Sequence, residues 1–259
     1  MIPQYASALL ISDIHLTPSM PLTAQRFFDF CEKEAPKVEA IFILGDLFEY
    51  WVGDDAASHS PFQQEVRHAL ANLATKTKTY YVHGNRDFLI GSDFLKKAGM
   101  TLLPERSHAE IAGTTYTLCH GDSLCTADVG YQVFRHWVRK PWVQKVFLKM
   151  PLHWRRSIAN RLRNNSHTQY QQYSKSSKLQ KTNVTLDACA AVLGTESHGR
   201  LIHGHTHLPA HHHEQLREQH WQRWVLSDWD VDHPESVKPR ASALLIDSQG
   251  VQYLDLVKN

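Results

Sequence analysis

Five short apolar runs in this chain each lead directly into residues that can bind a metal ion. The runs span residues 8–11, 41–44, 80–82, 116–118 and 201–202. They are followed by Asp13-Ile14-His15, Gly45-Asp46, Gly84-Asn85-Arg86-Asp87, His120-Gly121-Asp122 and Gly204-His205-Thr206-His207. Carboxylate, amide and imidazole side chains suit hard or borderline divalent cations, and not a zinc site of the thiolate type. The pattern therefore predicts a metal centre, provided that the fold brings these five segments together.

Two cations held side by side repel each other, so a two-metal centre needs an anion that both ions share. Asp46 is the candidate for this bridge, and Asp13 and His15 lie close enough in the chain to turn toward one ion. The other candidate ligands are Asn85, His120, His205 and His207. Such a centre can bind a phosphoryl group, lower the pKa of a bound water and hold the resulting hydroxide in line for attack. Mixed oxygen and nitrogen ligands favour manganese, with iron or zinc as alternatives.

The elements that must position these residues can be predicted from the same apolar runs. Short runs that end in Gly and Asp are typical of buried strands leading into loops. Helical patterns near residues 22–35, 61–75 and 92–97 alternate with the first strands, and prolines stand where two of these helices begin. In the last part of the chain, short apolar runs predict successive strands at 201–203, 221–226, 242–246 and 251–256. This order predicts an α/β fold, an α+β sandwich in which two mixed β-sheets are flanked by helices.

One segment of the chain is strongly basic. Residues 129–186 contain 12 Lys or Arg and no Asp or Glu, so the rest of the chain has a net charge of −10. Aromatic and aliphatic residues recur in this segment at helical spacing, and Pro141 and Pro151 stand where new helices can begin. Three or four short amphipathic helices are expected here. Their apolar faces alone are consistent with a simple cover over the core, but the absence of acidic residues favours an anionic partner.

The basic segment divides the chain into a core and an insertion. We expect a core formed by residues 1–126 and 183–259, and an inserted basic helical cap, or lid, formed by residues 127–182. The cap would enter after the strand that precedes His120 and leave before a helix near residues 184–193.

Composition and cysteine content limit the class of protein. Apolar residues make up 42% of the chain and charged residues 21%, as is ordinary for a soluble globular protein. The cysteines contain no Cys-x-x-Cys pair, so reduced, inert thiols in the cytosol are expected. The first apolar stretch is short and continues into Asp13, which indicates a strand and not a signal peptide. No run approaches about 20 apolar residues, so no membrane-spanning helix is expected.

The five segments, taken in order, resemble the motifs of the calcineurin-like metallophosphoesterases. That pattern is Asp-x-His, Gly-Asp, Gly-Asn-His, a single His and Gly-His-x-His, and this chain has all five blocks between residues 13 and 207. One position departs from it, because Arg86 stands where most of the family has a histidine that is often assigned as the general acid. Arg cannot release a proton near neutral pH, but it can bind phosphate oxygens bidentately. The departure favours a leaving group that needs no proton, such as a phosphate released from a pyrophosphate.

The residues around the motifs narrow the resemblance to one branch of these enzymes. Residues 45–49, 84–89, 120–126, 131–135, 163–166 and 226–229 are similar to the UDP-2,3-diacylglucosamine pyrophosphatases of bacterial lipid A synthesis. The resemblance covers nearly the whole chain. It implies a hydrolase that uses two Mn²⁺ ions, in which metal-activated water attacks the α-phosphate and UMP and 2,3-diacylglucosamine 1-phosphate (lipid X) are released. It also implies a peripheral enzyme at the cytoplasmic face of the bacterial inner membrane, whose anionic surface would be a partner.

The resemblance also implies roles for individual residues. The metal ligands of the family fall on Asp13, His15, Asp46, Asn85, His120, His205 and His207. Catalytic roles fall on Asp46, Asn85, Arg86 and His120, and substrate contacts fall on Asn85, Arg86, Asp128, Ser166 and His205. A further lysine that contacts substrate corresponds to Lys175 or Lys178, because this chain carries about four extra residues between 169 and 181.

Other residues of the same types are expected to have supporting roles. We expect His203 to pack, Asp87 and Asp122 to orient ligands or cap turns, Asp54 and Asp55 to lie in a loop, and Cys125 to be no nucleophile. The tract His211-His212-His213 is expected to be a solvated polar run on a strand or turn.

Three other functions fit part of the sequence. A soluble nucleotide pyrophosphatase or phosphodiesterase of the same superfamily would have a short polar pocket under the cap instead of an apolar chamber. A nucleic-acid phosphoesterase would use the basic cap and its tryptophans, but the near-neutral net charge of +2 argues against nucleic acid as a partner. A non-catalytic scaffold would be expected to lose ligands, and none is missing here. The sequence leaves acyl-chain length and oligomeric state open.

Overall fold

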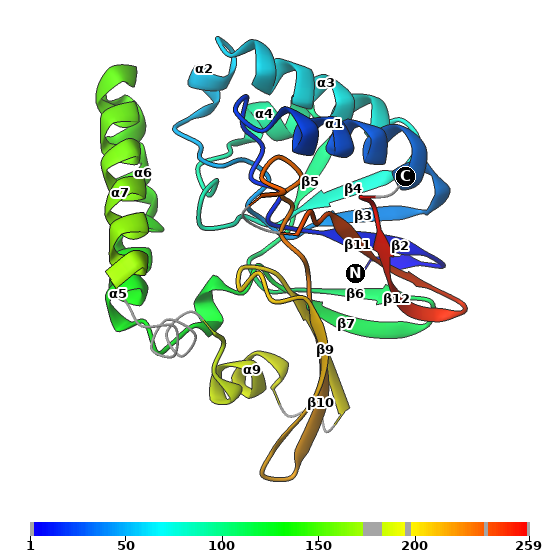
Figure 1. Cartoon of the computed structure of the whole chain (residues 1–259). Coiled ribbons are helices and arrows are strands. Elements are labelled where there is room, and N and C mark those ends of the chain that lie inside the picture. The colour runs from blue at the N-terminus through cyan, green and yellow to red at the C-terminus, as the bar shows by residue number, and fades with distance from the viewer. Residues whose placement is uncertain (1–2, 173–182, 195–197, 236–237, 258–259) are drawn as a thin grey trace.

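Two six-stranded mixed sheets form the centre of the protein (Figure 1). The computed structural model describes residues 3–172, 183–194, 198–235 and 238–257, without the side chains of 163–172 and 198. Sheet A has the order β1 (Gln4–Tyr5), β6 (Ser107–Ile111), β7 (Thr114–Leu118), β8 (His198–His203), β10 (Gln219–Val225) and β9 (Ala210–Leu216). Sheet B has the order β12 (Gly250–Asp255), β11 (Ser242–Asp247), β2 (Ala8–Ile11), β3 (Ala40–Ile43), β4 (Lys78–Tyr81) and β5 (Met100–Leu102).

The two sheets pack face to face through apolar inner faces, and β2 and β3 of sheet B are buried on both sides. In β2, Ala8 and Leu10 face sheet A, whereas Leu9 and Ile11 face the helices on the other side of sheet B. Such strands are typical of a sheet that is covered on both faces. The predicted α/β sandwich with two mixed sheets is therefore confirmed.

Helices cover the outer face of each sheet. The outer face of sheet B is covered by α1 (Pro21–Asp29), α3 (Pro61–Ala74) and α4 (Ser92–Lys97), as the top of Figure 1 shows. A π-helical turn (η1, Phe30–Glu34) and a 3-10 turn (η2, Ala35–Lys37) extend α1. The outer face of sheet A is covered by α9 (Leu186–Leu193), through a smaller core that includes Cys119, Cys189 and Leu201.

The cap helices stand to one side of the sandwich. They are α5 (Val129–Val138), α6 (Pro141–Lys149) and α7 (Leu152–Gln172), and they occupy the left of Figure 1. The prolines lie where the sequence places helix starts, because Pro141 is the first residue of α6 and Pro151 directly precedes α7. The three helices lie in the chain between β7 and β8, as expected of an insertion, and the boundaries at residues 127 and 182 stay a prediction.

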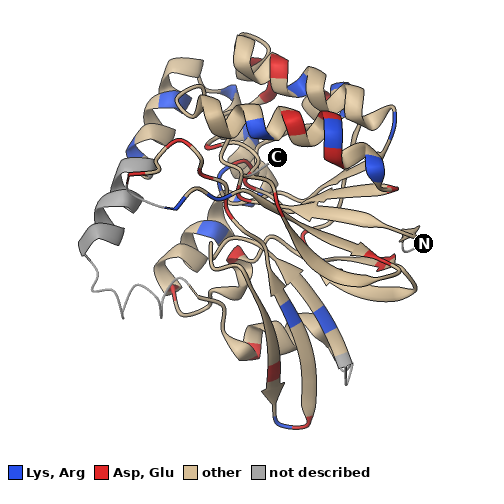
Figure 2. Cartoon of the chain, turned by 45° about the vertical axis from the view of Figure 1, so that its right-hand side comes forward, with Lys and Arg blue, Asp and Glu red and all other residues tan. Residues whose placement is uncertain are grey.

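The cap helices differ in charge from the helices over sheet B. The cap helices carry Lys and Arg without acidic residues, whereas both charges occur on the helices at the top of Figure 2. Within the described ranges, no helix is both long enough and apolar enough to cross a membrane.

Candidate metal centre

Every predicted metal ligand follows the carboxyl end of a strand. Asp13 follows β2, Asp46 follows β3 and Asn85 follows β4, and these three strands are parallel neighbours in sheet B. His120 follows β7 and the pair at 205 and 207 follows β8, which runs parallel to β7 in sheet A. Parallel neighbouring strands end at one edge of a sheet, and in α/β folds ligands bind outside these carboxyl ends.

The ligand loops have an unusual backbone conformation. Five of the seven candidate ligands have a positive φ, between 52° and 67°: Asp13, His15, Asp46, His205 and His207. The other non-glycine residues with positive φ in the described ranges are Ala112 and Arg217, which lie in turns between antiparallel strands. Asp, Asn and His tolerate this region better than most residues, and such strain gathers at functional sites when the surrounding structure enforces it.

Glycines let these loops approach one another. A Cβ atom added to Gly84 would lie 2.1 Å from Asp46 Oδ1, and one added to Gly204 would lie 2.2 Å from Asp13 Oδ2. The loops are also joined by backbone hydrogen bonds, in which Asp13 N donates to Gly45 O at 3.1 Å. The Gly in the Gly-Asn and Gly-His blocks is therefore required by packing around the carboxylates.

One group of candidate ligands consists of Asp13, His15 and His207, whose ligand atoms lie within 4.8 Å of one another. His207 Nε2 lies 3.4 Å from both His15 Nε2 and Asp13 Oδ1. Asp13 Oδ1 is buried and lacks a hydrogen-bond partner. A buried carboxylate oxygen without a donor is costly unless a cation or proton offsets its charge, so this group fits a metal ion.

A second group joins the two sheets. Asp13, Asp46 and His120 again lie within 4.8 Å, and Asn85 Oδ1 lies 2.9 Å from both His120 Nε2 and His205 Nδ1. The structure thus brings all seven candidate ligands together, and they fit two ions. Asp13 belongs to both groups of clustered ligand atoms, whereas Asp46 belongs only to the second. The bridging role of Asp46 therefore stays a prediction.

Neighbouring groups set the protonation of the imidazoles. The second ring nitrogen of His120, Nδ1, lies 2.8 Å from Leu44 O and can donate to it, which leaves Nε2 to act as a ligand. Burial and the nearby His120 lower the pKa of His205 to about 3, so this imidazole is neutral. Burial opposes the charged form of His207, but the nearby carboxylates of Asp13 and Asp228 raise its pKa to about 10. A cation bound there would displace that proton, so metal uptake should release protons.

The family model described as calcineurin-like phosphoesterase matches residues 7–209, which include every segment of the candidate centre. The chain belongs to the calcineurin-like phosphoesterase family.

Curated relatives of this phosphoesterase cover most of its length. It is 44% identical over 240 residues to a UDP-2,3-diacylglucosamine hydrolase of Ralstonia nicotianae, which is 90% of this chain and 87% of the relative. It is 44% identical to the protein of the same name from Tolumonas auensis, over 86% of this chain and 89% of the relative. The one from Escherichia coli is 40% identical, over 87% and 92%. The predicted enzyme class is confirmed, and this phosphoesterase is a hydrolase.

Two carboxylates behind the centre were not assigned from the sequence. Glu49 Oε2 lies 3.3 Å from His15 Nδ1, and Asp228 Oδ2 lies 3.4 Å from His207 Nδ1. Asp228 in turn accepts a hydrogen bond from Arg240 Nε at 2.6 Å. A carboxylate behind a ligating histidine fixes the ring orientation and raises its basicity. Glu49 and Asp228 belong to segments 45–49 and 226–229, which resemble the family, but their separation along the chain from His15 and His207 hides the pairing.

Asp87 organises the backbone around Asp46. Its carboxylate is fully buried and accepts hydrogen bonds from the backbone N–H groups of Asp46, Leu47, Phe48 and Gly84, at 2.7–3.2 Å. These contacts agree with the expected orienting role. The ligand loops after β3 and β4 therefore share one buried anion.

Replacing Asp87 with alanine should lower the free energy of unfolding by about 3 kcal/mol or more, because several buried N–H groups lose their acceptor. Urea denaturation in the presence of a chelator would measure the change apart from metal binding. The matched control is Asp93→Ala, which removes one exposed ion pair with Lys97 and should cost less than about 1 kcal/mol. Equal effects of the two substitutions would contradict this account.

Asp122 anchors the cap to the centre. It is buried and accepts hydrogen bonds from Tyr131 Oη and Arg135 Nε, both at 2.7 Å. Burial raises the pKa of Asp122, but the charges of His120 and Arg135 outweigh it and hold the pKa below its usual range. Tyr131 also stacks on the His205 ring, with the centroids 6.2 Å apart. The first cap helix is thus tied directly to the ligand loops.

The predicted substrate contacts are only partly placed. Arg86 lies at the centre, where its backbone N donates to Asp46 Oδ1 at 2.8 Å and its side chain is 35% exposed. Asp128 lies at the start of α5, and its Oδ1 accepts a hydrogen bond from Tyr131 N at 3.0 Å. Ser166 falls in the second half of α7, residues 163–172, where side chains are not described. Lys175 and Lys178 lie outside the described residues.

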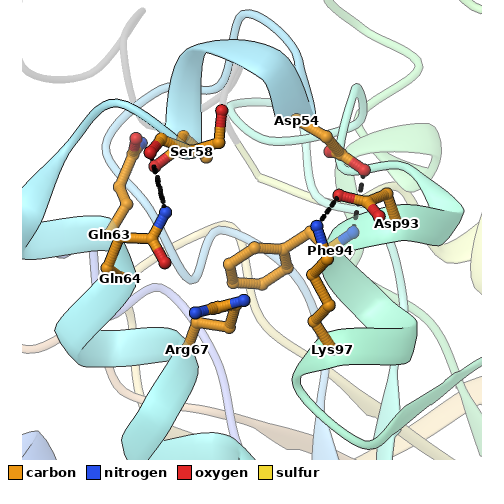
Figure 3. A pocket seen from close by; sticks show the side chains of 9 residues that line it. Asp54, Ser58, Gln63, Gln64, Arg67, Asp93, Phe94 and Lys97 are labelled. Carbon is orange, nitrogen blue, oxygen red and sulfur yellow. Dashed lines mark hydrogen bonds and ion pairs between the residues drawn. The ribbon is translucent and has the colours of Figure 1, made fainter.

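Asp54 and Asp55 lie apart from the metal centre, on the short helix α2 (Asp54–Ala57) and not in a loop as expected. Asp54 accepts hydrogen bonds from Trp51 Nε1 and from two backbone N–H groups at the start of α4. It borders a cavity of about 20 Å³ between α2, α3 and α4, in which Phe94 lies above Arg67 (Figure 3). That volume is far too small for a nucleotide. Asp55 instead pairs with Arg155 of α7.

The remaining candidates lie outside the metal centre. His203 is fully buried and contacts Gly204 O and Arg223 Nη1, at 2.8 and 3.2 Å. Burial raises the pKa of the Cys125 thiol to about 12, so the thiolate is scarce at neutral pH. The tract at 211–213 lies on β9, an edge strand of sheet A, where two of its three residues are exposed.

The seven candidate ligands predict how many metal ions each chain binds. Protein stripped with a chelator and reloaded with Mn²⁺ should contain about two ions per chain, because one cation leaves part of the buried negative charge unbalanced. Elemental analysis after gel filtration would measure the ratio. A ratio near zero ions per chain would contradict the metal centre, and a ratio near one would contradict the second metal ion.

Proposed function

We propose that this chain hydrolyses the pyrophosphate bond of UDP-2,3-diacylglucosamine in lipid A biosynthesis. The products would be UMP and 2,3-diacylglucosamine 1-phosphate, after attack of water at the α-phosphate. Relatives that bear this substrate in their names support the proposal, because they are 40–44% identical over nearly the whole chain. The observation that carries it on the chain itself is an exposed apolar surface on a basic cap that is fixed beside the candidate metal centre.

The candidate ligands would hold two Mn²⁺ ions. Asp13, His15 and His207 would hold one, and Asn85, His120 and His205 the other, with Asp46 shared between them. Divalent ions at this position polarise a phosphoryl oxygen and lower the pKa of a bound water. Manganese suits the mixture of carboxylate, amide and imidazole groups.

Arg86 would bind the phosphates and not donate a proton. Its guanidinium is partly exposed next to the ligand loops, and its backbone is hydrogen-bonded to Asp46. A guanidinium stays charged at neutral pH and binds phosphate oxygens in pairs. Because the phosphate that leaves a pyrophosphate is already a stable anion, no general acid is needed at this position.

The cap would form the binding site for the diacylglucosamine part. Besides the contacts of Asp122, Arg139 Nη2 donates to Gly84 O at 2.8 Å, and the buried Arg155 donates to Asp55 Oδ1 at 2.8 Å. The cap is thus attached to the core through α5 and through the start of α7. Neither α5 nor α6 has a buried residue. Their large exposed apolar side chains include Val129, Val133, Trp137, Trp142 and Val146.

Comparing substrates with and without acyl chains tests whether this apolar surface binds the lipid. A deacylated UDP-glucosamine should be cleaved much more slowly than the diacyl form, because the apolar surface of the cap would have no acyl chains to bind. Release of UMP from both substrates would measure the ratio. Equal rates would remove the reason for an apolar cap and favour the soluble nucleotide pyrophosphatase.

The same surface would attach the protein peripherally to the cytoplasmic face of the inner membrane. Exposed tryptophans and basic cap helices without acidic residues suit an anionic bilayer surface, where each cation adds at most about 1 kcal/mol. We expect sedimentation with anionic vesicles at low salt and weaker binding at high salt. Failure to sediment with anionic vesicles at low salt would contradict the membrane role.

One assay separates the two enzyme functions. UDP-2,3-diacylglucosamine, UDP-glucose and bis(p-nitrophenyl) phosphate should be offered to the Mn²⁺-loaded protein under the same conditions. Preference for the first by a large factor in kcat/KM supports the proposal. Comparable cleavage of UDP-glucose would favour a soluble nucleotide pyrophosphatase or phosphodiesterase instead.

A further inference from the structure

Glu49 lies between a metal ligand and the proposed phosphate clamp. Its Oε2 is 3.3 Å from His15 Nδ1, a buried ring nitrogen that has no hydrogen-bond partner within the described residues. Its Oε1 accepts a hydrogen bond from Arg86 Nη1 at 3.4 Å. The side chain of Glu49 is 24% exposed, and that of His15 is 13% exposed. One partly buried carboxylate therefore contacts two residues with different proposed tasks.

The backbone holds Glu49 in this place from both sides. Glu49 N donates to Leu16 O at 3.3 Å, directly after His15, and Leu16 forms a parallel bridge with Phe48. On the other side, Trp51 N donates to Arg86 O at 3.1 Å. The segment after Asp46 is thus hydrogen-bonded to the loop of His15 and to the loop of Arg86.

We propose that Glu49 is a positioning residue that couples His15 to Arg86. The carboxylate accepts the Nδ1 proton of His15, so that the ring presents Nε2 to the metal centre. Its second oxygen keeps the Arg86 guanidinium beside the centre, ready to move onto a phosphate. The part that concerns Arg86 rests on the proposed function, whereas the part that concerns His15 rests only on the geometry of the candidate centre.

Other roles for Glu49 fit the contacts less well. It belongs to neither group of clustered ligand atoms, and in the group that contains His15 the neighbouring His207 Nε2 lies 3.4 Å from His15 Nε2. A general base would also have to face that side, where water and phosphate would be bound. Glu49 faces Nδ1, so its effect must pass through His15 and Arg86. Contacts of this kind are often long without bound substrate and shorten in the productive complex.

Metal affinity tests the first half of the proposal without any substrate. We expect Glu49→Gln to weaken the binding of one of the two Mn²⁺ ions by about 10- to 100-fold, as is typical when the carboxylate behind a ligating histidine is lost. Free Mn²⁺ can be followed by electron paramagnetic resonance during titration of the chelator-stripped protein. The matched control is Glu34→Gln, because Glu34 is 20% exposed, pairs with Lys37 and lies before the amino end of β3.

Arg86→Ala should leave the Mn²⁺ affinity within about threefold of the parent protein, since the guanidinium faces the substrate side. If Glu49→Gln does not fold, Glu49→Asp is the second variant, and its shorter carboxylate should also weaken one Mn²⁺ ion. Unchanged Mn²⁺ affinity in a folded Glu49 variant would overturn the assignment to His15.

A double-mutant cycle tests the second half of the proposal. In the parent background, Glu49→Gln should lower kcat/KM for UDP-2,3-diacylglucosamine by about tenfold or more at saturating Mn²⁺. In the Arg86→Ala background the same change should have a clearly smaller effect, because the two residues act together. Strictly additive effects would overturn the coupling to Arg86. A parent protein that does not cleave this substrate would contradict the proposed function, and the Mn²⁺ titration would still decide the role of Glu49 toward His15.

Discussion

Replacing Asp46 with alanine should abolish hydrolysis. Asp46 is buried, its Oδ1 accepts the backbone N–H of Arg86, and its Oδ2 lies 3.7 Å from His120 Nε2. The carboxylate therefore lies among ligands from both sheets, where it would offset the repulsion between two cations. Without it, the second ion should be lost and kcat/KM should fall below detection.

The Asp46 variant needs a structural control and a chemical control. Asp46→Asn keeps the shape of the side chain and removes the charge, so it should also lose most of the activity. Asp29→Ala removes a carboxylate that pairs with Lys33 on α1 and should retain parent activity. Elemental analysis should be measured beside kcat/KM for each variant. An active Asp46→Ala protein with two ions would rule out the shared ligand.

Replacing Arg86 with alanine should lower kcat/KM by about 10²-fold or more, because a charged, bidentate phosphate contact is lost. Arg86→His should not restore full activity on the pyrophosphate, because the variant has lost a phosphate contact and the leaving phosphate needs no proton donor. Arg86→Lys keeps the charge without the planar fork and should recover only part of the loss. Steady-state release of UMP measures all three variants.

The Arg86 result is informative in both directions. A nearly silent Arg86→Ala variant would show that the guanidinium does not bind the phosphates. Full activity in Arg86→His would instead favour a general acid at this position. The circular dichroism spectrum and Mn²⁺ content of each variant should match the parent, so that loss of activity reports substrate binding.

The sequence predicted the strands that matter for the centre because they are buried on both faces. Strands β2 and β3 are continuous apolar runs that end in Gly and Asp, a pattern with few alternative interpretations. The strands β1, β5 and β6 were not predicted, and the tract on β9 was expected on a strand or turn. Of these four strands, β1, β5 and β9 lie at sheet edges, whereas β6 lies beside β1 inside sheet A. Edge strands are half-exposed and carry few apolar residues, as in the alternating β9, so periodicity alone does not separate them from loops.

Helix ends were predicted less well than helix positions. The first helix was expected to run to Ala35, but regular α-helix ends at Asp29 and continues as a π-helical turn and a 3-10 turn. Pro36 lies in the 3-10 turn, and a proline ring cannot donate to the helix or tolerate the carbonyl four residues before it. A wider turn before the proline is one way to accommodate that ring.

The candidate ligands could be recognised from motif order, whereas the residues behind them could not. Glu49 and Asp228 are single carboxylates in segments without a pattern of their own, and their task depends on which histidine the fold places against them. The same holds for Asp122, which binds a helix of the cap. Contacts of this type are set by tertiary packing, so periodicity and spacing carry no information about them.

The cap lies in the chain between β7 and β8, two parallel neighbours in sheet A. The chain therefore leaves and re-enters the fold at adjacent strands, and a change of length between them alters no strand register. The entropic penalty of lengthening such a connection grows only slowly, by about 0.6 kcal/mol for each doubling. The ligand loops have no such freedom, because their strained backbones are locked to one another. Mutations that confer resistance to a competitive inhibitor should accordingly accumulate in the cap helices and spare the strand ends. The same division makes the cap the segment to exchange when this scaffold is engineered for a new phosphate ester.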